Sequence, residues 1–379
     1  MSEAPNVCIT NVQILVFRAP VVEPVRTSFG IMRERPMVLI RIIDSDGISG
    51  WGEIWCNFPE CAAEHRAHLA RTLFVPLLLN RPLSDSAQIW QELTERTRLL
   101  AIQSGEPGPF AQTLAGIDIA LWDLCARRAG EPLWRFLGGS DPRIRLYASG
   151  INPESPERIT ATRLAEGYRA FKLKIGFGQD IDLRNLRAMR ETIGPDCSLM
   201  ADVNQAWNVE RAIAELKNLS DYQLGWVEEP LAADRPWSEW LQLVQQADIP
   251  LAAGENLLGT PAYFEAINSS ALKILQPDVA KWGGFSGCIP IVRAIHDAGL
   301  CYCPHYLGGG IGLLASAHLF AAMGGSGMLE VDANENLLRS ALASIVAPDS
   351  DGCAVLSEIP GLGPEPNIEV LRPFSVAVW

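Results

Sequence analysis

Eight short apolar segments recur at nearly regular spacing from residue 145 onwards, and they constrain the fold more than any other feature of the chain. They span residues 145–149, 170–175, 198–203, 224–228, 250–254, 272–276, 300–304 and 327–331. A spacing of roughly 25 residues suits one strand, one helix and two short loops. Eight such α/β units fit a modified (β/α)8 TIM-type barrel better than an open doubly wound sheet, because no dinucleotide-binding glycine signature follows any of these strands.

The residues before the barrel segment follow a different pattern. We expect a strand at 7–17, a polar loop at 18–35, an antiparallel hairpin of 37–43 and 48–54, and helices at 61–79, 84–100 and 111–128. These elements predict an N-terminal α+β capping domain over residues 1–130. The irregular tail at 348–379 is expected to return to this domain, and residues 143–347 are expected to form the barrel domain.

Local signals support helices and tight turns within the barrel segment. Favourable helix N-cap types are Ser155 before Pro156, Asp180, Asn208, and Thr260 before Pro261. The glycine-rich loops at 283–284 and 308–310 could bind a phosphate group. More often, such glycines let the chain turn closely at a strand end.

Composition limits the classes of partner. The chain has 379 residues, 48% of them hydrophobic and 20% charged, which is typical of a globular protein with two domains. A net charge of -13 argues against nucleic acid as a partner. The nine cysteines form no Cys-x-x-Cys pair, and neither a signal peptide nor a membrane span is recognisable. We therefore expect a cytoplasmic protein with reduced thiols, no membrane partner and a homo-oligomeric state.

The strand at 170–175 sorts its side chains completely between its two faces. Phe171, Leu173 and Ile175 take one face, and Lys172 and Lys174 take the other. Burying two ammonium groups is unfavourable unless anionic groups lie opposite them. Acidic side chains are therefore expected on the neighbouring strands.

Three such acids follow the next three strands, at Asp202, Glu228 and Glu255. The C-terminal ends of barrel strands converge, so these carboxylates should meet and repel one another unless a cation lies among them. Carboxylate oxygens favour Mg²⁺, with Mn²⁺ or Ca²⁺ as less favoured substitutes. Glu228 and Glu229 point to opposite faces, and alternation alone does not choose the ligand.

Groups able to carry protons flank the predicted metal site. Lys174 and Lys172 come from the second strand and His305 from the seventh, with Asp278 placed to orient the imidazole. A lysine beside a second lysine has its pKa lowered towards neutrality, so an amine and an imidazole could both act as bases. Glu330, if protonated, could donate a hydrogen bond to an enediolate.

Together these residues resemble the enolase superfamily, and within it the mandelate racemase subgroup, over nearly the whole chain. The matching motifs are Lys172-x-Lys174, Asp202-x-Asn204, Glu228-Glu229-Pro230, Gly254-Glu255-Asn256, Gln276-Pro277-Asp278, Pro304-His305 and Leu329-Glu330. The resemblance implies a capping domain on a modified barrel, one Mg²⁺ on Asp202, Glu228 and Glu255, and two bases, Lys174 and the His305/Asp278 dyad. It also selects Glu228 over Glu229. Related enzymes carry a lysine base at the place of Asp278, but Lys281 lies beyond the strand end and is not assigned as a base.

The resemblance points to a small-molecule carboxylate substrate and leaves its identity open. The 174–178, 276–278 and 283–287 stretches look similar to acid-sugar dehydratases and galactarolactone cycloisomerases, whereas 24–27 and 254–256 look similar to mandelate racemase itself. Asn204 and the loop arginines Arg26, Arg33 and Arg35 are candidates for substrate binding, although a solvated loop would also account for the arginines.

The expected reaction is loss of the proton α to a carboxylate, followed by dehydration or cycloisomerisation of a sugar acid. Two alternatives are a racemase or epimerase of a 2-hydroxy acid, because inversion needs bases on both faces, and a non-catalytic carboxylate-binding protein. His65 and His68, one helical turn apart, are expected on a solvated helix face, and His296 and His318 are expected to be structural.

Overall fold

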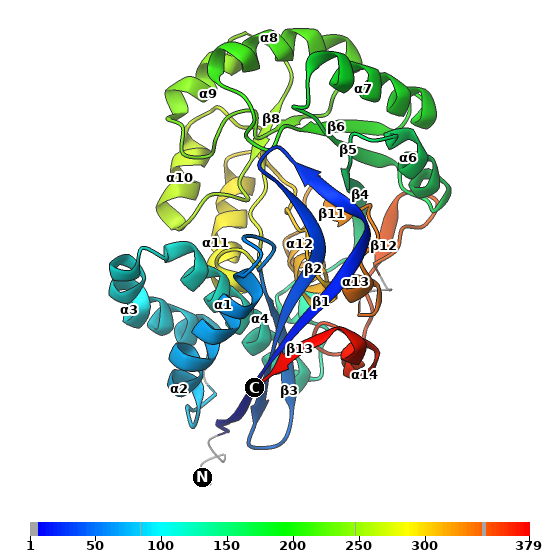
Figure 1. The fold of residues 1–379 in the computed structure, drawn as a ribbon. Coiled ribbons are helices and arrows are strands. Elements are labelled where there is room, and N and C mark those ends of the chain that lie inside the picture. Colours follow the sequence, from blue (N-terminus) through cyan, green and yellow to red (C-terminus); the bar gives the residue numbers. More distant parts are fainter. Residues whose placement is uncertain (1–6, 84, 247, 343–345) are drawn as a thin grey trace.

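A long antiparallel hairpin from the N-terminal third of the chain reaches across the molecule. The computed structural model describes residues 7–83, 85–246, 248–342 and 346–379. In it β1 (Ile9–Thr27) pairs with β2 (Gly30–Asp44), and β3 (Ser49–Ile54) pairs with β2. Figure 1 shows the tip of this hairpin beside the barrel strands. There the Ser28 hydroxyl donates to the carbonyl oxygen of Asn204.

The polar loop expected at 18–35 was therefore wrong, because both strands continue through it. Their pairing runs from Arg18 opposite Pro36 to Thr27 opposite Gly30, with one irregularity between Pro20 and Val25. Prolines are tolerated there because β1 has a neighbour on its other side only near residues 15–17, which leaves this part of the strand at a sheet edge.

The last strand of the chain completes the N-terminal sheet. β13 (Ser375–Val378) pairs antiparallel with β1, Leu15 lying opposite Val378, and the strand order is β13-β1-β2-β3. The helical elements beside this sheet are α1 (Ala62–Leu69), the π-helix η1 (Ala70–Phe74), α2 (Val75–Leu78), α3 (Ser86–Ser104) and α4 (Pro107–Ala129). Beyond α4 the short helix α5 (Leu133–Phe136) leads towards the barrel.

Eight parallel strands form the second sheet, which confirms the modified TIM-type barrel. They are β4 (Arg143–Ile151), β5 (Ala170–Lys174), β6 (Ser198–Asp202), β7 (Val227–Glu228), β8 (Leu251–Ala253), β9 (Ile274–Leu275), β10 (Cys301–Tyr302) and β11 (Leu329–Asp332). Their order is β10-β9-β8-β7-β6-β5-β4-β11, and β12 (Cys353–Val355) adds to β4 in the antiparallel sense. No ladder joins β10 to β11 within the described residues, but Gly327 touches the carbonyl oxygen of Tyr302 so closely that a Cβ there would overlap it.

Helices follow the barrel strands and lie outside them (Figure 1). They are α6 (Pro156–Ala165), α7 (Gln179–Ile193), α8 (Val209–Leu219), α9 (Trp237–Val244), α10 (Thr260–Asn268), α11 (Gly284–Asp297), α12 (Gly310–Met323) and α13 (Leu337–Ser340). Three short elements complete the chain: η2 (Ser220–Tyr222), α14 (Ile368–Leu371) and η3 (Arg372–Phe374). Within the described residues, no helix combines the length and the apolar character that crossing a bilayer requires.

The helix starts agree only in part with the N-cap signals. Asn208 caps α8 and accepts from the Arg211 amide as expected. The cap of α7 is Gly178 instead of Asp180, and the cap of α10 is Gly259 instead of Thr260. Glycine occupies these two positions because their φ angles, 127° and 86°, are ones that other residues rarely adopt.

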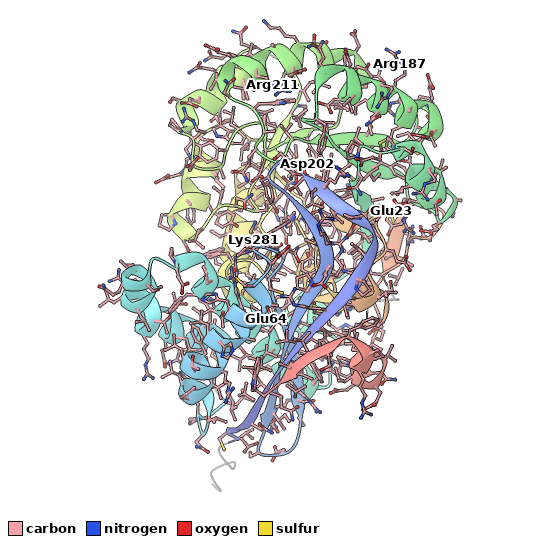
Figure 2. All side chains as sticks on the ribbon, viewed as in Figure 1. Glu23, Glu64, Arg187, Asp202, Arg211 and Lys281 are labelled. Carbon is pink, nitrogen blue, oxygen red and sulfur yellow. The ribbon has the colours of Figure 1, made fainter. Side chains whose placement is uncertain are left out.

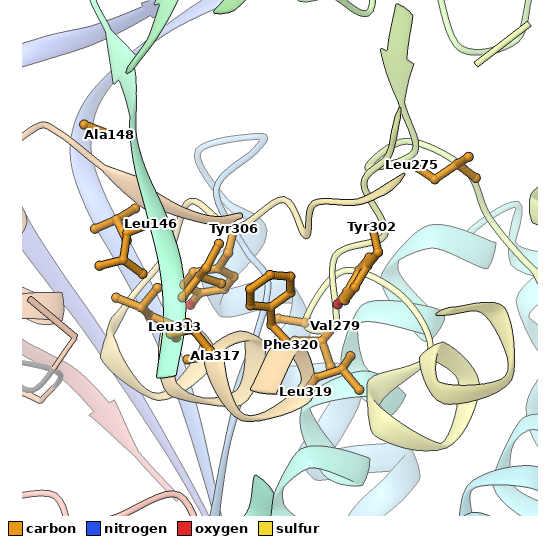
Figure 3. Packing of buried hydrophobic residues seen from close by; sticks show 14 of the residues in the cluster. Leu146, Ala148, Leu275, Val279, Tyr302, Tyr306, Leu313, Ala317, Leu319 and Phe320 are labelled. Atoms are coloured by element: carbon orange, nitrogen blue, oxygen red, sulfur yellow. The ribbon is translucent and has the colours of Figure 1, made fainter. Parts of the chain in front are cut away.

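One hydrophobic cluster is shared by the barrel and the N-terminal sheet. It includes Phe17, Met37 and Leu39 of the hairpin together with barrel side chains such as Leu146 and Phe320. Figure 3 shows part of this cluster, where side chains of α12 pack beside β4 and β10. The hairpin is therefore fixed to the barrel by burial as well as by hydrogen bonds such as the one from Ser28 to Asn204.

A buried carboxylate also joins the two parts. Glu53 of β3 accepts hydrogen bonds from the backbone amides of Gly309 (2.6 Å) and Gly312 (2.9 Å) at the N-terminus of α12. The Gly309 amide belongs to the glycine-rich loop at 308–310 that could have bound phosphate, and the Gly312 amide belongs to the first turn of α12. A side chain of this protein takes that role, and the helix N-terminus favours its negative charge. Burial nevertheless raises the pKa of Glu53.

The closest packing in the N-terminal part lies between β3 and α4. A Cβ at Gly52 would overlap the carbonyl oxygen of Gly116, and one at Gly50 would overlap that of Ala120.

We expect Gly52→Ala to lower the free energy of unfolding by about 1–3 kcal/mol, because the helix must move away from the strand. Gly108→Ala, where nothing lies within 4 Å of the new methyl group, is the matched control and should be nearly neutral in urea denaturation. Equal stability of the two variants would contradict this packing.

His318 of α12 predicts a measurable pH dependence of stability. Its Nδ1 accepts from the Trp134 amide at 3.0 Å, and burial lowers the pKa of the imidazole to about 3. The unfolded chain therefore takes up a proton near pH 6.5 that the folded protein refuses, so stability falls as pH drops below about 6.5. Between pH 8 and pH 5 this contributes a loss of about 2 kcal/mol.

His318→Asn keeps an acceptor for the Trp134 amide and removes the titration. We expect the fall in unfolding free energy from pH 8 to pH 5 to be about 2 kcal/mol smaller in this variant than in the parent, whatever its absolute stability. Parallel curves for the two proteins would show that His318 does not titrate as its burial implies.

Candidate active site

The polar residues at the strand ends line one cavity beneath the hairpin. It has a volume of about 390 Å³ and is bounded by barrel residues such as Asp202, Lys281 and His305 and by residues of the N-terminal part such as Trp55. Figure 2 labels Asp202 and Lys281 at the part of the barrel beside the hairpin. The volume is in the range of small-molecule sites.

In the buried network at the strand ends, acidic side chains outnumber lysines and histidines, and Arg35 and Arg66 also line the cavity. The carboxylates are Asp202, Glu228, Glu229, Glu255, Asp278 and Glu330, and the bases are Lys172, Lys174, Lys281 and His305. Among the described residues of this network, six acids therefore face four bases. Most of these groups are buried, which is a strong constraint because a buried charge needs a partner. Burial, together with the neighbouring Glu255, raises the pKa of Glu229 well above its usual value.

Lys172 is held between two carboxylates. Its Nζ lies 2.6 and 2.7 Å from the two oxygens of Glu228 and 2.8 Å from Glu330, and it stands over the ring of Tyr147. Burial would lower the pKa of this amine, but Glu228 and Glu330 together raise it well above its usual value. The lowering expected from a neighbouring lysine does not apply to Lys172, because the two carboxylates dominate.

Lys174 lies beside Asp202 and Asn204. Its Nζ donates to Asn204 Oδ1 at 2.8 Å and lies 3.7 Å from Asp202 Oδ2. The Asn204 amide groups in turn donate to both oxygens of Asp202. Asn204, Gln205 and Glu229 adopt positive φ angles of 47°, 66° and 40°, strained conformations that are typical of functional sites.

His305 lies between two acids on another side of the cavity. Its Nδ1 is 2.7 Å from Asp278 and its Nε2 is 2.6 Å from Glu255. Burial would lower the pKa of the imidazole, but Glu255 and Glu330 raise it well above its usual value. The residue therefore carries a proton in this arrangement, and Asp278 fixes its orientation.

Glu330 accepts hydrogen bonds and donates none within the described network. The Ser149 hydroxyl and the Tyr306 amide both donate to it. Burial would raise its pKa, but Lys172 and His305 lower it. In this arrangement Glu330 serves as an acceptor, and its role as a protonated donor stays a prediction.

The donor set fits a divalent cation. Asp202 and Glu228 end β6 and β7, and Glu255 follows β8 after Gly254. Burial raises the pKa of Glu228 to about 7 although Lys172 opposes the shift. No group of three or more acidic, histidine or cysteine side chains forms a ready metal centre in the part of the chain that the structure describes. Instead, Lys172 contacts Glu228, and His305 contacts Glu255. Carboxylate oxygens such as these are the donors that Mg²⁺ prefers.

The three loop arginines lie in different surroundings. Arg26 is half exposed, with its Nε 3.1 Å from Glu154, and Arg33 lines a neighbouring cavity with Arg18 and Glu34. Arg35 lines the main cavity, but it is buried and paired with Asp332 at the end of β11. The structure thus brings only Arg35 of the three to the cavity.

Sequence analysis missed three further polar residues of the cavity wall. Lys281 returns to the cavity because Asp278 Oδ1 accepts from the amides of residues 280 and 281, which turns the chain back; its Nζ then donates to Asn256 Oδ1 at 2.6 Å. Arg66 and Gln112 belong to α1 and α4. The sequence does contain a signal that Arg66 is buried, because this residue lies on a helix face otherwise made of alanines at 62, 63, 67 and 70.

Known proteins match both parts of the chain. Residues 10–138 match the family described as mandelate racemase / muconate lactonizing enzyme, N-terminal domain, and residues 156–370 match the family described as enolase C-terminal domain-like. The D-galactarolactone cycloisomerase of Agrobacterium fabrum is 31% identical over 357 residues, covering 90% of this chain and 91% of that protein. Other relatives include sugar-acid dehydratases and racemases.

Solved structures agree with the sequence relatives. A mandelate racemase/muconate lactonizing enzyme from Bordetella bronchiseptica superposes with a TM-score of 0.91 at 53% identity, covering 97% of this chain and 99% of that chain. A racemase from Streptomyces coelicolor with bound magnesium gives 0.88 at 28% identity, covering 97% and 100%. The chain therefore belongs to the enolase superfamily, in its mandelate racemase subgroup, and is an enzyme of the lyase or isomerase type.

Proposed function

We propose that this enzyme removes the proton α to the carboxylate of a sugar acid and then expels a β-substituent by dehydration or cycloisomerisation. The observation that carries the proposal is the arrangement of an amine, Lys174, beside Asp202 and an imidazole, His305, beside Glu255, both lining one cavity. Relatives that act on sugar acids and their lactones support this substrate class.

The metal ligands would be Asp202, Glu228 and Glu255, one from the end of each of β6, β7 and β8. Magnesium held there would stabilise the negative charge that develops on the substrate carboxylate when the α-proton leaves. Binding the cation would release Lys172 and His305 from two of these carboxylates. We expect one ion per chain, with Mn²⁺ as a substitute for Mg²⁺.

Lys174 and His305 have complementary tasks in the proposed dehydration. Lys174, oriented by Asn204, accepts the α-proton. His305, oriented by Asp278, gives its proton to the departing β-hydroxyl group, which leaves as water. The remaining enol then becomes a keto-deoxy acid. General acid and base groups of this kind contribute about 10²–10⁴-fold each.

A second candidate is racemisation of an aryl 2-hydroxy acid. The same amine and imidazole could remove and return a proton on opposite faces of the α-carbon. The observation that favours this candidate is the apolar part of the cavity wall, where Phe29, Phe58 and Leu307 could contact an aromatic ring.

Incubation with candidate acids in deuterated water separates these reactions. We expect a keto-deoxy product from a sugar acid with the parent enzyme, and a loss of at least about a hundredfold in rate for Lys174→Ala and for His305→Ala. Lys217→Ala, an exposed lysine of α8, is the matched control. Proton NMR showing α-deuterium in both stereoisomers of a 2-hydroxy acid would favour racemisation, and full activity of either variant would refute the assigned roles.

Metal dependence is testable without turnover. We expect MgCl₂ to raise the melting temperature of the parent protein, since a ligand of the folded state stabilises it in proportion to RT ln(1 + [L]/Kd). Glu255→Gln should lose most of this shift, whereas Asp180→Asn, an exposed carboxylate of α7, should keep it. Chelation by EDTA should abolish turnover, and Mg²⁺ should restore it. An identical shift in all three proteins would contradict the ligand set.

A further inference from the structure

One arginine of the cavity wall is buried without a carboxylate partner. Arg66 of α1 is 5% exposed and lines the same cavity as Lys174 and His305. Arg35 and Arg66 are the two most buried arginines among the described residues, and Arg35 is paired with Asp332. For Arg66, the described residues provide no ion pair within 4.0 Å. Of these two arginines at one cavity, Arg35 is thus neutralised by Asp332, whereas Arg66 has no carboxylate partner among the described residues.

The guanidinium of Arg66 is nevertheless held in one orientation. Its Nε donates to Gln112 Oε1 at 2.8 Å, and its Nη1 lies 3.2 Å from His65 Nδ1. His65 Nε2 lies 3.1 Å from Glu106, so the imidazole accepts from Arg66 on one side and donates to Glu106 on the other. His65 is therefore part of this support and not a solvated residue alone. These contacts use Nε and Nη1 and leave Nη2 without a hydrogen-bond partner in the described part of the chain.

Gln112 adds a second donor at the same place. It is 7% exposed, it lines the cavity, and its Oε1 is occupied by Arg66. Its Nε2 group, which has two hydrogens, makes no hydrogen bond within the described residues. Both residues line the cavity, and both keep a nitrogen without a hydrogen-bond partner among the described residues, which can only donate. Such a pair suits a carboxylate, which only accepts when ionised.

Burial makes this arrangement unfavourable unless an anion completes it. Removing a guanidinium from water without an anionic partner is costly, and burial lowers the pKa of Arg66. A structural arginine would gain more from an acid at position 112 than from glutamine. The neutral Gln112 leaves the positive charge of Arg66 available to a ligand.

We propose that Arg66 and Gln112 bind a second carboxylate at the end of the substrate remote from the reacting carbon, so that the preferred substrate is a dicarboxylic sugar acid. This inference rests on the proposed function, because the first carboxylate is the one expected at Asp202, Glu228 and Glu255. It selects aldarates over aldonates, which end in a hydroxymethyl group, and over aryl 2-hydroxy acids, whose far end is apolar. The specificity group would come from helices α1 and α4 and not from the hairpin arginines.

Matched pairs of ligands test the proposal by binding alone. Galactarate and galactonate, and likewise glucarate and gluconate, differ at the far end in carboxylate against hydroxymethyl. We expect isothermal titration calorimetry in the presence of MgCl₂ to give at least one pair in which the parent protein binds the diacid about ten- to a hundredfold more tightly, the effect of a hydrogen bond to a charged group.

Two variants and one control assign the preference to residues. Gln112→Glu has nearly the shape of glutamine, supplies an internal anion to Arg66 and should abolish the preference for the diacid while the fold is kept. Arg66→Met should do the same. Arg96→Met, an exposed arginine of α3, should leave the preference unchanged. If Arg66→Met fails to fold, Gln112→Glu alone still decides, and circular dichroism verifies the fold of each protein.

The outcomes distinguish this inference from the proposed function. No preference for the diacid in either pair, or a preference that Gln112→Glu leaves intact, would overturn the role of Arg66 and Gln112 even if sugar acids lose their α-proton in deuterated water. Tighter binding of mandelate than of every diacid would also overturn it. Conversely, a diacid preference that depends on Arg66, without α-proton exchange by any acid, would refute the reaction and keep the binding site.

Discussion

The charge balance at the ends of the barrel strands is the constraint on which the rest of the site depends. Six carboxylates and four bases are held there with little access to water, and such groups are tolerated only when each charge has a partner. Lys172 between Glu228 and Glu330, and His305 between Asp278 and Glu255, show how the protein distributes the available positive charge. The carboxylates of Asp202, Glu228 and Glu255 make the site suited to a dication, which would in turn stabilise an anionic substrate.

The N-terminal part supplies what the barrel lacks. Barrel strands provide acids and bases for proton transfer, whereas the hairpin, α1 and α4 provide apolar side chains and the Arg66–Gln112 pair. Glu53 and the shared hydrophobic cluster fix these elements to α12, so that groups from distant parts of the chain keep their positions across one cavity. Rigid support of this kind is what orientation-dependent chemistry requires.

Sequence reasoning reached the barrel because its signals are local and periodic, and it reached the family because the motifs at the strand ends resemble it. Alternation in residues 170–175 and the polar residue after each strand follow from side-chain geometry alone. Prolines and charges at 18–35 predict a loop when the sequence is considered alone. They also suit an edge strand, but this becomes clear only once the rest of the sheet is known. Lys281 was set aside because counting residues past a strand does not reveal a turn that brings the chain back. Arg66 depends on which face of α1 is buried, a tertiary property, although an arginine among alanines was a visible hint.

The pairing of β13 with β1 has a consequence for how the molecule is made. Leu15 and Val378 are neighbours in space but lie far apart in the sequence. During synthesis, three strands of this sheet leave the ribosome long before the fourth exists, and the entire barrel is translated in between. The edge of β1 must therefore stay unpaired throughout elongation, when it is a potential site for chaperone binding or association with other nascent chains.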